Sequence, residues 1–166
     1  MKNKKLIIII VAVIILVGIA VIAFSGSSSA YLDSFSTTEI YDGVDDSFTT
    51  VGGTRTLDDD VILEFTDKDL PYLIDYTVVK AKDAKNINEI GIFKVQDGKA
   101  KELKNIIQKY VDDKQQLYRS MDYFPEEVEK IDFAKVSVMG NYVVYSFLNE
   151  KDTEAFYSAI EELIKK

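Results

Sequence analysis

The side chains that gather at spacings suited to chemistry are carboxylates. Two carboxylates held across a cleft at a defined separation can hydrolyse a glycosidic bond. Consecutive aspartates, however, point in diverging directions, and this favours a helix cap or a solvated turn over catalysis. The densest group lies within 12 residues and consists of Asp58, Asp59, Asp60, Glu64, Asp67 and Asp69.

A second acidic group contains Asp42, Asp45 and Asp46. Calcium accepts such oxygens, but the stretch lacks the alternating ligand positions and the closing Glu of an EF-hand loop. The spacing therefore predicts a solvated turn with at most weak calcium binding. No metal or cofactor is expected.

The sequence contains no histidine and no cysteine. The usual general base near neutral pH, the usual activator of a nucleophile and the thiolate metal ligand are therefore absent. Gly52-Gly53 is followed by no lysine at the spacing of a phosphate-binding P-loop. The composition predicts a protein that is not an enzyme, with no catalytic residues.

Tyrosine is frequent, with ten in the chain. Exposed tyrosines can stack on sugars or anchor a protein partner. Tyr123, Phe124 and Glu126 form one candidate recognition loop, and Tyr142 and Tyr145 lie beside it in the predicted hairpin. The alternative is structural: the tyrosine rings lie in the core, and Phe124 packs inward at the entry of a helix.

Alternating apolar positions predict strands. Gly140-Asn141 predicts a tight hairpin between the last two strands, and Asp97-Gly98 predicts a turn. The predicted strands are Ile74–Lys82, Glu89–Val95, Val136–Met139 and Tyr142–Leu148.

Apolar residues at helical spacing predict a long helix from Lys99 to Arg119 and a last helix that begins at Asp152 or Thr153. Pro125 at a first helical position predicts a short helix. Ser36-Thr37-Thr38-Glu39 predicts a capping box that opens a short amphipathic helix. The acidic run that begins at Asp58 predicts either a short helix or a strand.

These elements predict an α+β fold. The expected domain, residues 58–166, has the order ββαββα in two layers, with a four-stranded, mostly antiparallel sheet and its helices on one face. A shift of 53 residues places Asn88 on Asn141 and Leu103 on Phe156, which supports two similar halves. A duplication is not inferred, because two amphipathic patterns also align by chance.

Leu6–Phe24 is a run of 19 apolar or glycine residues without a charge. A helix of that length spans roughly 28 Å, close to the hydrocarbon core of a bilayer. Lysines in residues 1–5 predict a cytoplasmic flank, and residues 25–57 a polar stalk that leads to an extracytoplasmic domain. The expected location is a cell membrane, spanned once. The alternative is a cleaved signal peptide with a cut after Ala30.

The exported part is acidic. The three lysines of the flank leave 17 of the 20 basic residues against all 28 acidic ones. Such a surface disfavours nucleic acid and anionic head groups as partners. The membrane, through Leu6–Phe24, and an envelope protein or wall component are the partners expected.

Short motifs also carry a family resemblance. They are Asn88-Glu89-Ile90-Gly91-Ile92-Phe93-Lys94, Tyr123 with Pro125-Glu126, and Gly140-Asn141-Tyr142-Val143. In order and spacing, the stretch from about Asp58 to Lys166 resembles a family of small extracytoplasmic proteins of Gram-positive anaerobes, known only as a domain of unknown function. The resemblance implies an anchored envelope domain and supplies no activity.

The expectation is therefore an anchored, non-enzymatic binding module. The alternatives are a carboxylate-dependent hydrolase of envelope polymers and a secreted soluble factor released near Ala30.

Overall fold

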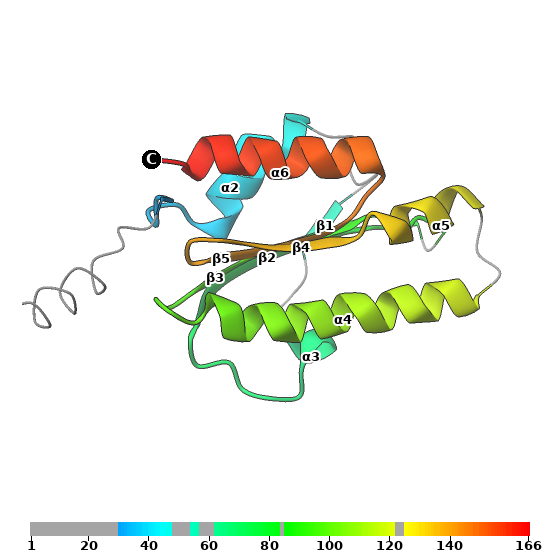
Figure 1. Ribbon diagram of the computed structural model, residues 1–166, viewed down its shortest axis with the longest axis horizontal. Helices are drawn as coiled ribbons and strands as arrows, with labels where there is room; N and C mark the ends of the chain where they lie inside the picture. Colours follow the sequence, from blue (N-terminus) through cyan, green and yellow to red (C-terminus); the bar gives the residue numbers. More distant parts are fainter. Residues whose placement is uncertain (1–29, 48–53, 57–61, 84, 122–124) are drawn as a thin grey trace, which may run out of the picture. The chain divides into compact units, whose positions relative to one another are not determined.

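In the computed structural model, an antiparallel sheet lies between two layers of helices (Figure 1). The sheet has the strand order β1-β2-β3-β5-β4, and every neighbouring pair is antiparallel. The structure describes residues 30–47, 54–56, 62–83, 85–121 and 125–166. The strands are β1 (Thr54–Thr56), β2 (Leu73–Ala81), β3 (Glu89–Val95), β4 (Lys135–Met139) and β5 (Tyr142–Phe147).

The α+β class, the antiparallel sheet and the order ββαββα are confirmed, but the two-layer arrangement is wrong. Every residue of β5, and every residue of β3 except Lys94, is buried. Both faces of these central strands are therefore apolar, and each face needs a covering layer. The expected four strands are present, and the short β1 adds a fifth at the edge beside β2.

One face of the sheet is covered by α4 (Ala100–Ser120) and by the short helix α3 (Ile62–Phe65). Leu103 and Ile107 of α4 pack with Phe93 of β3 and with Val143 of β5 in the core of this face. The helix α5 (Pro125–Asp132) follows α4 and leads into β4. The short helix predicted at Pro125 is thus confirmed.

The opposite face is covered by α2 (Thr37–Val44) and α6 (Glu150–Ile164). Ile92 of β3 packs there with Ile40 of α2 and Ile160 of α6. The predicted start of the last helix, Asp152 or Thr153, is two or three residues too late, because Asn149 is the N-cap and the helix begins at Glu150. The Asn149 side-chain oxygen accepts a hydrogen bond from the Asp152 backbone N–H at 2.9 Å.

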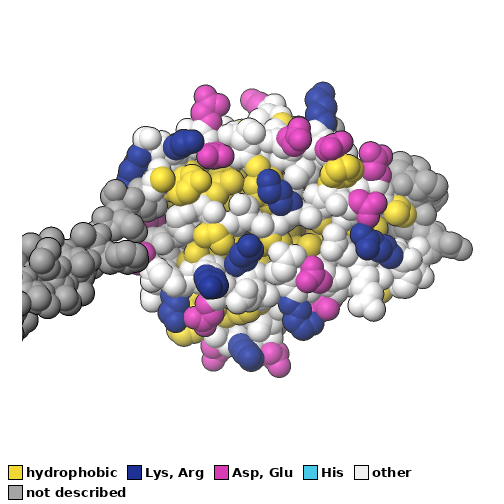
Figure 2. Space-filling view, in the orientation of Figure 1, with side chains coloured by type: hydrophobic (Ala, Val, Ile, Leu, Met, Phe, Trp, Pro, Cys, Tyr) yellow, Lys and Arg dark blue, Asp and Glu magenta, His cyan; other side chains and the backbone are white. Residues whose placement is uncertain are grey.

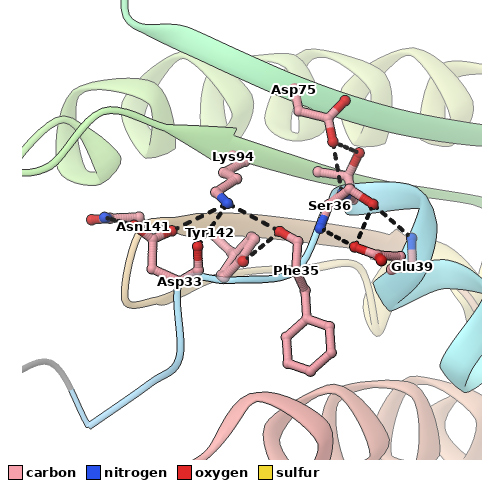
Figure 3. A network of polar contacts seen from close by, with 9 residues as sticks. Asp33, Phe35, Ser36, Glu39, Asp75, Lys94, Asn141 and Tyr142 are labelled. Atoms are coloured by element: carbon pink, nitrogen blue, oxygen red, sulfur yellow. Dashed lines mark hydrogen bonds and ion pairs between the residues drawn. The ribbon is translucent and has the colours of Figure 1, made fainter.

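The segment before α2, residues 31–36, is bound along the end of the sheet (Figure 3). Lys94 Nζ donates to the backbone oxygens of Asp33 and Phe35, at 2.8 and 3.1 Å. The Tyr142 hydroxyl also donates to the Phe35 oxygen, at 2.7 Å. We call residues 31–36 the strap.

The predicted capping box of α2 is confirmed: the Ser36 side chain accepts from the Glu39 N–H, and the Glu39 carboxylate accepts from the Ser36 N–H. Because the strap and α2 pack on the sheet, the compact unit spans Tyr31–Lys166. This compact unit begins 27 residues before residue 58, where the expected domain starts. The stretch predicted as a stalk includes α2, a 3₁₀ turn (Asp45–Ser47) and β1.

Several sequence-based predictions fall outside the described residues. They concern Leu6–Phe24, Asp58–Asp60, Tyr123 and Phe124. Within the part of the chain that the structure does describe, no helix combines the length and the apolar character needed to cross a bilayer.

Candidate functional site

A buried carboxylate lies on the α4 face of the sheet. Glu89 opens β3 and is only 2% exposed. Gly91 follows two residues later on the same face, directly opposite Tyr145 of β5. A Cβ atom at Gly91 would come within 2.1 Å of the Tyr145 ring. The missing side chain therefore lets the ring lie across β3 and reach Glu89.

Three side chains converge on this carboxylate. The hydroxyls of Tyr145 and Tyr110 both donate to Glu89 Oε1, at 2.5 and 2.6 Å. The Lys114 ammonium forms an ion pair with Glu89 Oε2, and it also contacts the Tyr110 hydroxyl at 2.8 Å. We call Glu89, Tyr110, Lys114 and Tyr145 the Glu89 cluster.

Burial governs the protonation of the cluster. It raises the pKa of the Tyr110 and Tyr145 hydroxyls well above their usual range, and the neighbouring Glu89 charge adds to the effect. Both hydroxyls are therefore neutral hydrogen-bond donors at pH 7. Burial also lowers the pKa of Lys114, while the Glu89 carboxylate opposes that shift.

The Lys114 ammonium is surrounded by aromatic rings as well as by the carboxylate. It lies 5.1 Å from the ring centre of Tyr110, 5.8 Å from that of Tyr118 and 5.4 Å from that of Phe147. Such rings attract a cation through their negative faces. The side chain is 16% exposed, so the ammonium lies near the surface and not at the centre of the core.

An open pocket of about 350 Å³ lies against the cluster on α3 and α4. Its walls combine apolar surface with charges of both signs. Two ion pairs hold the rim: Glu64 with Lys80 of β2, and Asp113 with Lys109 at 2.5 Å. We call this cavity the α4 pocket; it is lined by Glu64, Phe65, Lys109, Tyr110, Asp113, Lys114 and Leu117.

Two of the residues predicted for recognition, Tyr142 and Tyr145, lie in the interior of the domain. Both side chains are fully buried, so these two tyrosines do not present a ring on which a partner could stack. Their rings occupy opposite core layers of the central strand β5. Glu126 lies in the first turn of α5. Tyr123 and Phe124 lie outside the described residues.

The acidic residues noted in the sequence lie in different parts of the structure. Glu64 reaches the rim of the α4 pocket, whereas Asp67 and Asp69 are exposed. Asp42 and Asp46 are also exposed. Among the described residues, no group of three or more acidic side chains is arranged to hold a metal ion.

Sequence reasoning missed Lys114 and Tyr110 as site residues. A signal was present: the apolar stripe of α4 continues from Ile107 through Val111, and Lys114 occupies the next position along it. A lysine inside an apolar stripe indicates a buried anionic partner. Glu89 in an otherwise apolar strand is the matching signal.

Comparison with known families locates the cluster in the chain. Residues 71–148 match the model of a domain of unknown function, DUF4358. This stretch is a DUF4358 domain. No curated protein and no solved structure matches the chain. The DUF4358 match runs from Pro71 to Leu148, the residue after β5, so it contains the whole Glu89 cluster. The helices α2 and α6 lie outside the match. The predicted resemblance to an uncharacterised domain family is thereby confirmed.

Proposed function

We propose that this chain is a single-pass membrane protein whose extracytoplasmic DUF4358 domain is a non-enzymatic binding module. The α4 pocket is its binding site, and an envelope protein or wall component is its ligand. The membrane location and orientation are supported by the uncharged run Leu6–Phe24 and the lysines before it. The binding role is supported by the pocket.

One observation carries the binding role: polar groups converge beneath an open pocket with apolar walls. Phe65, Tyr110 and Leu117 supply ring and aliphatic surface, and Leu117 is 50% exposed. Ion pairs supply the polar groups: Lys114 with Glu89 at the floor, and Glu64 and Asp113 with their lysines at the rim. A ligand with an apolar body and polar groups of both signs matches these walls.

The pocket favours binding over hydrolysis because its acids are already paired. Glu64 and Asp113 lie in the same pocket, as a carboxylate-dependent hydrolase requires. Each, however, is neutralised by a lysine, Lys80 or Lys109. The tyrosine hydroxyls of the cluster are neutral and already donate to Glu89, so they are not bases that could remove a proton from a ligand.

A second candidate function, the secreted factor, is favoured by one observation. The compact unit begins at Tyr31, the residue that a cut after Ala30 would leave at the N-terminus. Tyr31 pairs with Lys165, and the Leu32 N–H donates to the Ile164 oxygen at 2.7 Å. N-terminal sequencing of the mature protein distinguishes the two forms: Met1 or Lys2 indicates the anchor, and Tyr31 the secreted factor.

A site-directed photo-crosslinker tests the binding site. A benzophenone amino acid replaces Leu117 at the pocket rim in the full chain, and intact cells are irradiated. The matched control carries the benzophenone amino acid in place of Gln116. This neighbouring residue of α4 is exposed and does not line the pocket. We expect one reproducible adduct from position 117 and none from position 116. Equal labelling from both positions, or none from either, would contradict a ligand in the α4 pocket.

A further inference from the structure

The strand β4 forms one edge of the sheet, with β5 as its neighbour on one side. Its sequence, Lys-Val-Ser-Val-Met, carries a single charge, at its first residue. The register with β5 is continuous and has no bulge. Exposed sheet edges are commonly protected by central charges, proline or bulges, and β4 has none of these.

The hairpin fixes which backbone groups of β4 face outward. Met139 and Tyr142 flank the two-residue turn, whose Gly140 has a φ of 62°. This closing pair is hydrogen-bonded, and pairs alternate along an antiparallel ladder. Lys135, Ser137 and Met139 therefore bond to β5. The N–H and C=O groups of Val136 and Val138 point away from the sheet.

The outward groups allow one symmetric register for a second β4 strand. If Ser137 faces Ser137 of another copy, Val136 lies opposite the other copy's Val138, and both such pairs exchange two backbone hydrogen bonds. The α4 face of this junction then brings together four valines, among them Val138, which is 37% exposed in the single chain. Figure 2 shows exposed apolar side chains in a band between the charged side chains of the two helix layers.

Charge favours the same register. The helix α6 runs beside β4, and the Tyr157 hydroxyl donates to the Lys135 oxygen at 2.7 Å. Glu161 lies one helical turn further on, toward Met139, where it pairs with Lys165 at 3.3 Å and lines an open groove together with Lys135. In the symmetric register, Lys135 lies beside the other copy's Met139. Its ammonium therefore comes close to the other copy's Glu161, and the contact occurs twice.

We propose that β4 is a self-association edge: two copies of this chain pair their β4 strands in antiparallel register about Ser137, giving one continuous ten-stranded sheet. This inference does not depend on the α4 pocket, which lies on α3 and α4.

Cysteine crosslinking tests the register, since the chain has no cysteine of its own. In the purified full chain, Ser137→Cys places one cysteine in each copy. The two Cα atoms are then roughly 4.5 Å apart, which is within disulfide range. The matched control is Lys135→Cys. In the proposed register its two cysteines are offset by four residues along the strands, about 13 Å. We expect S137C to give a disulfide-linked dimer on mild oxidation and K135C to give no disulfide crosslink. Equal crosslinking of both variants, or none of S137C, would overturn the proposal.

A charge exchange tests the contact without cysteines, by sedimentation of the full chain. Lys135→Glu and Glu161→Lys should each lower the dimer association constant about fivefold, and the double exchange should restore it. A chain that is monomeric at all concentrations, or a double variant as weak as the single ones, would overturn the proposal. The photo-crosslinking at Leu117 is unaffected by either result.

Discussion

At the residue scale, the Glu89 cluster depends on one glycine. The Tyr145 ring crosses β3 at Gly91, where any Cβ atom would overlap the ring. The ring in turn brings its hydroxyl to Glu89. The sequence pattern Glu-Ile-Gly therefore encodes the acid and the space for its partner in three consecutive residues.

Gly91→Ala is expected to destabilise the domain by about 2–3 kcal/mol, from overpacking and from the displaced tyrosine hydrogen bond. The free energy of unfolding in urea measures this loss. In a Tyr145→Ala background the same substitution should cost much less, because the ring that it meets is gone. Equal costs in both backgrounds would show that the contact is not the cause.

Glu89→Gln should destabilise the domain by about 2–3 kcal/mol, since it leaves the Lys114 ammonium without its anion. The fully buried limit is larger, but Lys114 is 16% exposed and can turn toward water. Adding Lys114→Met to the Gln variant should recover part of the loss. If E89Q alone unfolds at the wild-type urea midpoint, the ion pair contributes nothing.

Alkaline pH should weaken the fold through the buried tyrosines. In the unfolded chain Tyr145 loses its proton near pH 10, whereas burial raises its pKa in the folded state. Above pH 10 the folded state therefore binds more protons than the unfolded state, and stability falls as pH rises. Tyr145→Phe should reduce that slope by about 1 kcal/mol per pH unit between pH 10 and 11. An unchanged slope in urea titrations would contradict a buried, neutral Tyr145.

At the element scale, the sequence was informative where one period dominated. Glu89–Val95 was predicted with both of its ends correct, and the long helix was displaced by one residue. The layer arrangement was missed because a strand that is apolar on both faces was interpreted as having one buried face. Glu-Ile-Gly-Ile-Phe-Lys-Val is a nearly continuous apolar run, which is typical of a central strand with cover on both sides.

The faint repeat between the two halves is not a structural duplication. β3 and β5 are antiparallel neighbours, and β2 and β4 lie outside them. A rotation that superposes β2 and β3 on β4 and β5 keeps α4 on its own face of the sheet, where a duplicated half would carry α6. The two helices lie on opposite faces, so the two halves have opposite handedness. Amphipathic periodicity alone accounts for the aligned residues.

The strap is an element that periodicity cannot reveal, because side-chain hydrogen bonds to its backbone hold it in place. Lys94→Met removes both donations to the strap and should increase amide hydrogen exchange in residues 31–36, while α4 keeps its protection. Lys109→Met, which breaks an exposed pair on α4, is the control and should leave the strap protected. Unchanged exchange in K94M would show that other contacts suffice.

At the scale of the whole molecule, the α4 pocket, the edge strand β4 and the strap belong to one compact unit. The apolar run Leu6–Phe24 precedes this unit in the sequence. The unit accounts for 136 residues, Tyr31–Lys166, and the DUF4358 match covers its sheet from β2 to β5. The sequence predicted the class of domain, and the membrane location stays a prediction. The sequence could not predict the pocket, because α3 and α4 meet there only through the fold.

Protease treatment of intact cells stripped of their wall tests the central proposal, that Leu6–Phe24 spans a membrane with the domain outside. The full chain carries a C-terminal epitope tag, and a cytoplasmic protein with the same tag reports any lysis. We expect external protease to remove the tag from the cell-associated chain while the cytoplasmic control stays intact. A tag that survives until the cells are lysed would place the domain inside the cell and contradict the account.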